Sequence, residues 1–171
     1  MNFTRLTYCS TQQKFKISEF CGGAGAKENL RALGLSVGDE IFFKSRKNGH
    51  GKLLVELNNK EISIGYEIAS KILLETDVPE TTTLDKIRIG DIVEVTKMGA
   101  KGDVRFRLLD MGLVKGVQLK IIRVAPLGDP IEVLINEFNL SLRLDEAKNI
   151  EVKVIEINRS HQKSRKKWGM F

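Results

Sequence analysis

Residues 30–39, LRALGLSVGD, have the pattern of a helix that ends at a glycine and is followed by a turn. Nearly the same pattern returns at residues 108–117, LLDMGLVKGV. A shift of 78 positions pairs Leu30 with Leu108, Gly34 with Gly112, Leu35 with Leu113 and Gly38 with Gly116. We call this helix–glycine–turn pattern the helix–turn device. Because the device occurs twice at a fixed spacing, it predicts that the chain is a duplicated module.

The same shift holds well beyond this device. It also pairs Leu6 with Leu84, Val55 with Val133, Asn58 with Asn136, Ala69 with Ala147 and Ile72 with Ile150. Each copy therefore has about 75 residues, which is close to the lower limit for an independent hydrophobic core. We expect a first domain at residues 1–75, a linker at 76–83 and a second domain at 84–157. The linker sequence, TDVPETTT, carries a proline, two acids and a run of threonines.

Each copy is predicted to be mainly β. In the second copy, β-branched and alternating patterns predict strands at residues 90–95, 117–124, 131–135, 140–144 and 150–157. The helix between the first two strands places Val104, Leu108 and Met111 on one face, and we expect Val104 and Leu108 to be fully buried. Five short strands and one short helix are typical of a small, bent β-barrel, because closure removes exposed strand edges.

The glycines of the repeated device are predicted to be structural. Gly34 and Gly112 stand where a helix commonly ends with a residue at positive φ, which glycine adopts without a Cβ clash. Gly38 and Gly116 then turn the chain into the next strand. On physical grounds alone the device is architectural.

The net charge of +6 is concentrated at one end of the chain. Five basic residues and no acid lie in residues 158–171, which leaves +1 for everything before them. This basic tail has three interpretations: a disordered, solvated extension, a segment attracted to an anionic membrane surface, or a nucleic-acid contact. A globular part that is almost neutral argues against a nucleic-acid-binding barrel.

Patterns that signal catalysis or a stable metal site are weak. His50 lies in a glycine loop, and it and His161 lack the cysteine spacing of a zinc site. The glycines before the first helix lack the spacing of a phosphate-binding loop. Cys9 and Cys21, with no secretory signal and no apolar run of roughly 18 residues, favour a reducing, cytoplasmic location. We therefore expect neither an enzyme nor a bound cofactor.

Residues 107–152 of the second copy resemble the ferrous iron transport protein A family, FeoA. The resemblance is carried by Arg107 and Leu108, by Met111, Gly112 and Leu113, by Gly116, by APLGDP at 125–130 and by SLRLDEAKNIEV at 141–152. The first copy is more divergent. It has Asn29, Ala32 and Leu33 in place of Arg107, Asp110 and Met111, and RKNGHGK at 46–52 in place of the proline-rich turn.

The resemblance implies two tandem SH3-like barrels and a non-enzymatic accessory protein of ferrous iron uptake. Members of the family accompany FeoB, a membrane transporter with a cytoplasmic GTPase domain. They are expected in the cytoplasm, at the inner face of the membrane, where transient contact with ferrous iron or another transition metal is open to them. The alternative function is a metal-responsive or nucleic-acid-binding regulatory module, related to the SH3-like domain of iron-dependent repressors.

A partner-binding surface is predicted on the second copy. Its centre is the turn formed by Pro126, Leu127, Asp129 and Pro130, because prolines stiffen a loop and Leu127 at its tip is hard to bury in so small a barrel. A stiff apolar tip loses less conformational entropy when it docks. The helix residues Arg107, Leu108 and Met111 complete the predicted surface. The alternative for Leu127 is that it folds back onto its own barrel.

Overall fold

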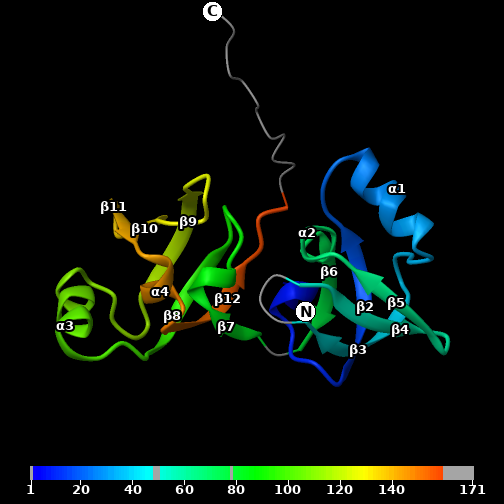
Figure 1. Cartoon of the computed structure of the whole chain (residues 1–171), viewed down its shortest axis with the longest axis horizontal. Coiled ribbons are helices and arrows are strands. Elements are labelled where there is room, and N and C mark those ends of the chain that lie inside the picture. The colour runs from blue at the N-terminus through cyan, green and yellow to red at the C-terminus, as the bar shows by residue number, and fades with distance from the viewer. Residues whose placement is uncertain (1, 48–50, 78, 160–171) are drawn as a thin grey trace, which may run out of the picture. The chain divides into compact units, whose positions relative to one another are not determined.

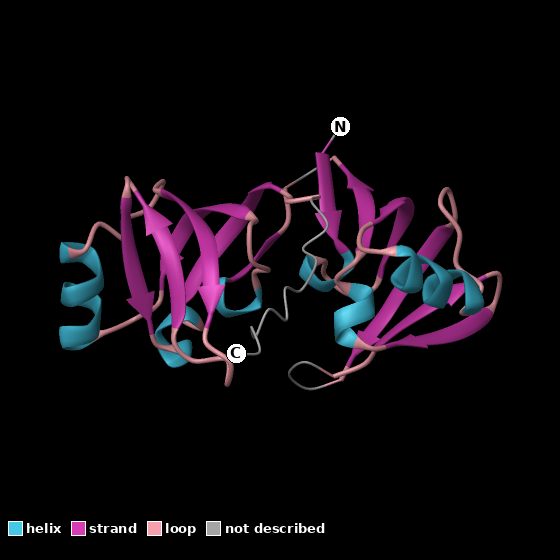
Figure 2. Ribbon diagram, turned by 90° about the horizontal axis from the view of Figure 1, so that it is seen from above, coloured by secondary structure: helices cyan, strands magenta, loops and turns pink. Residues whose placement is uncertain are grey.

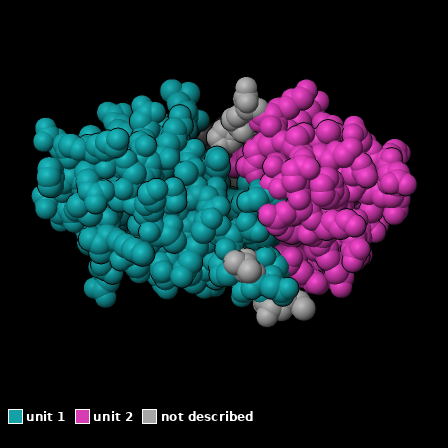
Figure 3. Space-filling model, turned by 90° about the horizontal axis from the view of Figure 1, so that it is seen from below, with its two compact units in different colours: residues 1–10, 76–158 teal, residues 11–75, 159–171 magenta. Residues whose placement is uncertain are grey.

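The chain forms two compact units in the computed structural model, which describes residues 2–47, 51–77 and 79–159 (Figure 3). Unit 1 consists of residues 1–10 and 76–158, and it therefore holds the second repeat together with the first ten residues of the chain. Unit 2 consists of residues 11–75 and of the chain from residue 159 onward, and it holds most of the first repeat. Residues 2–10, which the repeat pattern predicts in the first domain, cluster with unit 1.

Unit 2 is built around an antiparallel sheet in which five strands follow the order β6-β2-β3-β4-β5 (Figure 1). Its elements are β2 (Gln13–Phe20), α1 (Ala24–Ala32), β3 (Glu40–Arg46), β4 (Leu53–Leu57), β5 (Lys60–Ile64), α2 (Tyr66–Ala69) and β6 (Ile72–Thr76). The helix α1 connects β2 to β3, which is the position that the repeat pattern predicts for it.

Unit 1 repeats this arrangement in a six-stranded antiparallel sheet of order β11-β10-β9-β8-β12-β7. Its elements are β1 (Asn2–Arg5), the 3-10 helix η1 (Leu6–Tyr8), β7 (Thr81–Thr83), the 3-10 helix η2 (Leu84–Lys86), β8 (Ile92–Met98), α3 (Gly102–Asp110), β9 (Gln118–Val124), β10 (Ile131–Ile135), β11 (Phe138–Leu142), α4 (Leu144–Ala147) and β12 (Ile150–Glu156). Figure 2 shows that each unit is mostly strand, with its helices at the margins.

The core of unit 1 follows the alternation of its strands. Ile131, Val133 and Ile135 of β10 are buried, whereas the residues between them are not. The facing positions Leu140 and Leu142 of β11 join the same cluster. Residues that alternate in this way bury one face of each strand, as the period-2 pattern predicts.

The hairpins of the two repeats turn in the same way. Asn58 and Asn59 connect β4 to β5 with φ of 52° and 64°, and Asn136 and Glu137 connect β10 to β11 with φ of 43° and 77°. Two-residue turns with both φ values positive match the twist of antiparallel strands, and asparagine tolerates them best after glycine. The pair Asn58 and Asn136 therefore marks one turn in both repeats.

Two details differ from the sequence-based expectation. Residues 81–83, which were predicted to belong to the linker, form β7 and pair with residues 151–153 of β12. The predicted strand at 140–144 ends at Leu142, because the short helix α4 begins at Leu144. The carboxylate of Glu146 accepts the backbone N–H of Arg143 at 2.9 Å, which favours a helical turn at that point. The predicted basic tail lies outside the described residues from position 160 onward, as does His50.

Candidate partner-binding surface

The repeated helix ends have the geometry that their glycines require. Gly34 and Gly112 have φ of +88° and +90°. The N–H of the next residue in each case, Leu35 or Leu113, donates to the carbonyl oxygen five residues earlier, at 3.1 and 3.0 Å. This is the bonding pattern of a Schellman motif. Both leucines are fully buried, so each helix end is tied into its own barrel.

Gly38 and Gly116 close the second half of the device. Their φ values are +94° and +91°. Gly38 donates its N–H to the carbonyl oxygen of Ile17, and Gly116 donates to that of Val95, each at 2.8 Å. These bonds fasten the turn after the helix to the strand before it. The device therefore positions the helix against the first long strand of each repeat.

The helices themselves pack differently. Ala26 and Leu30 of α1 are both buried, whereas α3 buries Leu108 and leaves Val104 40% exposed. The prediction that Val104 is fully buried is wrong. The physical reason is that α3 meets its barrel only through its last turn, so its first six residues are all exposed and it stands clear of the strands in Figure 1.

The turn at residues 125–130 is held at its base. The N–H of Ala125 donates to the carbonyl oxygen of Pro130 at 3.0 Å, and the N–H of Gly128 donates to that of Ala125 at 2.7 Å. Pro126 and Leu127 are thereby the two central residues of a hydrogen-bonded β-turn, in which proline is favoured at the first central position. The side chain of Leu127 is 96% exposed. It does not fold back onto its own barrel.

Asp129 connects this turn to α4. Its carboxylate accepts the N–H of Leu144 at 3.1 Å and lies 3.9 Å from the guanidinium of Arg143. A carboxylate at the first turn of a helix satisfies an N–H that has no partner within the helix. The position of Asp129 suits it to hold the turn in place, so that Leu127 stays at the tip.

The other predicted surface residues are distributed over exposed and buried positions. Arg107 is partly exposed and forms an ion pair with Glu146. Met111 is half-buried against the core of unit 1, and Leu108 has no exposed surface. Pro126 and Pro130 are both exposed. Leu108 therefore anchors α3 to the core of unit 1. Of the three helix residues, only Arg107 presents an accessible side chain.

Several exposed apolar side chains were missed by the sequence reasoning. Besides the predicted Leu127, the large hydrophobic residues of unit 1 with substantial exposure are Val104, Phe106, Val114, Ile122, Leu134, Phe138 and Ile155. Phe106 on α3 is 65% exposed. Its signal in the sequence was available, because it lies two residues from both Val104 and Leu108 and so falls off the apolar face of the predicted helix.

The described residues hold no candidate metal site and no membrane-spanning helix. Within residues 2–47, 51–77 and 79–159, no group of three or more His, Cys, Asp or Glu side chains is arranged to hold a metal ion. None of the helices in that part of the chain is long and apolar enough to cross a membrane.

Comparison with known proteins decides the family. The FeoA domain matches residues 4–76 and matches again at residues 82–154. The chain belongs to the FeoA family. The predicted fold class, mainly β with two tandem SH3-like barrels, is confirmed. FeoA domains are non-catalytic accessory domains, which agrees with the prediction that this chain is not an enzyme.

Individual FeoA relatives match one repeat or both. A fusion of Fe(2+) transport protein A with the Fe(2+) transporter FeoB, from Porphyromonas gingivalis, is 36% identical over 75 residues, which cover 44% of this chain and 9% of the fusion protein. The FeoA protein from Chlorobium tepidum is 45% identical over 47% of this chain and 76% of its own length, with a TM-score of 0.43.

One solved structure is similar over nearly the whole length of this FeoA-family chain. Iron(II) transport protein A from Clostridium thermocellum has a TM-score of 0.56, with 93% of this chain and 95% of that chain covered. The two sequences are 17% identical, so the likeness concerns the fold.

Proposed function

We propose that this chain is a non-enzymatic accessory protein of ferrous iron uptake that binds a FeoB-type transporter through unit 1. Membership of the FeoA family places it among proteins whose names refer to iron transport. The fusion protein of Porphyromonas gingivalis supports the choice of partner, because it joins the two components in one polypeptide. The matched segment covers 9% of that fusion protein.

The observation that carries the proposal is the exposure of Leu127. A leucine that is 96% exposed at the tip of a hydrogen-bonded turn gains free energy only when another molecule covers it. Pro126 limits the conformations of the turn before binding, so little conformational entropy is lost on docking. These are the properties of an apolar anchor that fills a pocket on a partner.

The proposed partner, a FeoB-type transporter, also implies where in the cell this chain acts. The GTPase domain of a FeoB-type transporter faces the cytoplasm, so unit 1 acts there, close to the inner face of the membrane. Contact between the basic tail and anionic lipid fits this location, although the tail lies outside the described residues. The near-neutral charge before residue 158 favours protein–protein contact over the alternative of a nucleic-acid-binding regulator.

The test compares two exposed aliphatic side chains. The Leu127→Asp variant places a charge where the apolar anchor docks, and it is expected to weaken binding to detergent-solubilised FeoB by about 30-fold or more. Val37→Asp is the matched control, because Val37 is 59% exposed and belongs to unit 2. Binding is measured by surface plasmon resonance with each variant at the same concentration, after circular dichroism has shown that both are folded.

The outcome also distinguishes the two functions. Equal affinity of Leu127→Asp and the unaltered chain would show that the turn is not the docking surface. Absence of any binding by the unaltered chain, together with salt-dependent binding of duplex DNA, would favour the regulatory alternative.

A further inference from the structure

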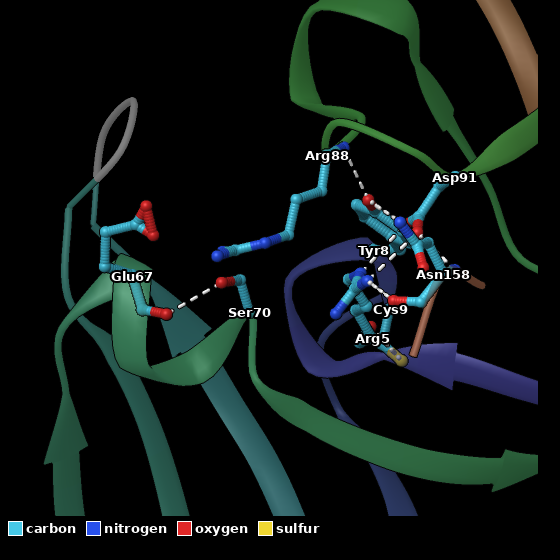
Figure 4. Close-up of polar contacts among 8 residues, drawn as sticks. All are labelled: Arg5, Tyr8, Cys9, Glu67, Ser70, Arg88, Asp91 and Asn158. Atoms are coloured by element: carbon cyan, nitrogen blue, oxygen red, sulfur yellow. Dashed lines mark hydrogen bonds and ion pairs between the residues drawn. The ribbon is translucent and has the colours of Figure 1, made fainter. Parts of the chain in front are cut away.

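A fully buried carboxylate, Asp91, lies immediately before β8 in unit 1. Its two oxygens accept four hydrogen bonds (Figure 4): from Nε of Arg5 at 2.8 Å, from Nη2 of Arg5 at 2.9 Å, from the hydroxyl of Tyr8 at 2.7 Å and from the backbone N–H of Asn158 at 2.8 Å. An ionised carboxylate is costly to bury unless hydrogen bonds and an opposite charge compensate it. Here both are present, and Arg5 and Asp91 meet in the two-pronged geometry that a guanidinium offers.

The groups around Asp91 come from stretches that are far apart in sequence. Arg5 and Tyr8 lie within the first ten residues, whereas Asn158 follows β12. They also bind one another or their neighbours: Arg5 donates to the carbonyl oxygen of Asn158 at 2.9 Å, and the N–H of Arg88 donates to the Tyr8 hydroxyl at 2.7 Å. Arg5 is 2% exposed and Tyr8 is 3% exposed. The ring of Tyr8 belongs to the hydrophobic core of unit 1.

The backbone next to Asp91 is shaped to admit Asn158. Gly90 has φ of +91°, and a Cβ at that position would collide with the side chain of Asn158. The repeat shift places Gln12, Gln13 and Glu80 at the positions that correspond to Gly90, Asp91 and Asn158. Gln12 keeps the positive φ, at 63°, but the first repeat has no carboxylate at the position of Asp91. The cluster is therefore specific to unit 1.

We propose that residues 5–10 act as an N-terminal strap that closes the second repeat, with Arg5 and Tyr8 hydrogen-bonded to Asp91 and Arg5 also to Asn158. The strap supplies one of the two charges of a buried pair and an aromatic ring of the core. When it is released, Asp91 stays behind as a buried, uncompensated charge, and the end of β12 loses its anchor. Loss of these contacts therefore opens unit 1.

The hydroxyl of Tyr8 is suited to its position as a donor. Burial raises its pKa well above the ordinary value of 10.0, and the charge of Asp91 raises the pKa further, while Arg5 lowers it. The hydroxyl therefore keeps its proton at neutral pH and donates it to the carboxylate.

The strap is tested in the full chain by segment-resolved hydrogen–deuterium exchange. Arg5→Met keeps most of the apolar stem and removes the guanidinium. Loss of one partner of a buried ion pair is expected to speed amide exchange in β8 and β12 by at least about 100-fold. Exchange in β3 and β4 of unit 2 stays within about threefold of the unaltered chain. Arg123→Met is the control, because the ion pair of Arg123 with Glu132 also lies in unit 1 but is exposed on the arginine side.

A milder variant covers the case in which Arg5→Met does not fold. Tyr8→Phe keeps the ring in the core and removes one hydrogen bond to Asp91. It is expected to speed exchange in β8 and β12 by about tenfold. The proposal is overturned if neither variant changes exchange in these strands by more than threefold. It is equally overturned if exchange rises to the same extent in both units, because the segment then supports the whole chain rather than the second repeat.

Discussion

The two repeats share their interior device and differ on their surfaces. Among the described residues, unit 2 exposes two large hydrophobic side chains, Leu33 and Val37, whereas unit 1 exposes eight. The glycine turns, the buried leucine after each helix and the hairpin asparagines are the same in both. Duplication has therefore kept what the barrel needs and has left the outside of each copy free to diverge. Both repeats match the FeoA domain, and the apolar surface is found on the second.

The helices show this difference most directly. Buried Ala26 and Leu30 hold α1 along its length, whereas Leu108 alone fixes α3. A helix that is held at one end presents Val104 and Phe106 to the surroundings. The comparison teaches that a repeated barrel can expose apolar side chains by loosening the packing of one helix.

The largest effect is expected at the buried leucines that the repeats share. Leu30→Ala and Leu108→Ala should each destabilise their own unit by about 3 kcal/mol, because each removes a fully buried side chain and leaves a cavity. Urea titration with segment-resolved hydrogen exchange measures the two units separately. A much smaller loss of stability for Leu108→Ala would break the comparison. It would show that the stability of unit 1 does not depend on the packing of α3 against its core.

The next effect concerns the glycines that end the two helices. Gly34→Ala and Gly112→Ala should each cost about 1–2 kcal/mol, because both backbones have φ near +90°. Gly25→Ala is the matched control in the first turn of α1, where φ is not positive and alanine is expected to stabilise the helix by up to about 1 kcal/mol. Thermal unfolding of the three variants checks the opposite signs. Stabilisation by Gly112→Ala would contradict the conclusion that both helix ends require glycine at positive φ.

A smaller effect is expected at Asp129, whose hydrogen bond with the N–H of Leu144 has no counterpart in unit 2. Asp129→Ala removes the acceptor for the N–H of Leu144 and should destabilise unit 1 by about 1 kcal/mol. The corresponding position of the first repeat is Gly51, so unit 2 has no equivalent. Asp145→Ala on the same short helix is the control. Its carboxylate is 95% exposed, and the change should stay within about 0.5 kcal/mol in a chemical denaturation experiment.

The smallest effect is a dependence on pH. Burial raises the pKa of Glu80 from its ordinary value of 4.5, and a backbone hydrogen bond from Ser10 partly opposes the shift. A raised pKa means that the folded state favours the protonated carboxyl. Its contribution to stability is therefore full below about pH 4.5 and is lost as the pH rises through the folded pKa. The stability of unit 1 relative to a Glu80→Gln variant should decline from pH 4 to pH 7, and a rise over that range would contradict the burial of Glu80.

Much of the fold could be predicted because it is encoded locally. The 78-residue shift, the alternation in β10 and the glycines at helix ends each depend on neighbours a few residues apart. The stretch at 131–135 matches β10 at both ends. Leu127 could be singled out for a related reason, since a leucine between two prolines at a strand junction has little room in a small barrel.

The parts that sequence reasoning missed depend on distant partners. Val104 has the spacing of a core residue, but whether it is buried depends on how α3 leans on its barrel. Helix α4 begins where carboxylates of Asp129 and Glu146 accept backbone N–H groups, and Asp129 lies 15 residues away in sequence from the N–H that it accepts. The pairing of Arg5 with Asp91 spans 86 positions and crosses a repeat boundary. No periodic pattern in the sequence could therefore predict it.

The contacts of Arg5 also set an order of events during protein synthesis. Arg5 contacts Asn158, which is added to the growing chain 153 residues later. At roughly 5–20 residues per second, that interval is about 8–30 s. Most of the first repeat is translated in this interval and can fold co-translationally. The second repeat, in contrast, cannot be completed until its last strand, β12, has been made. Only then are both acceptors of Arg5, Asp91 and the carbonyl oxygen of Asn158, available. The hydrogen bonds of Arg5 to Asp91 and Asn158 therefore form only after the second repeat has been translated.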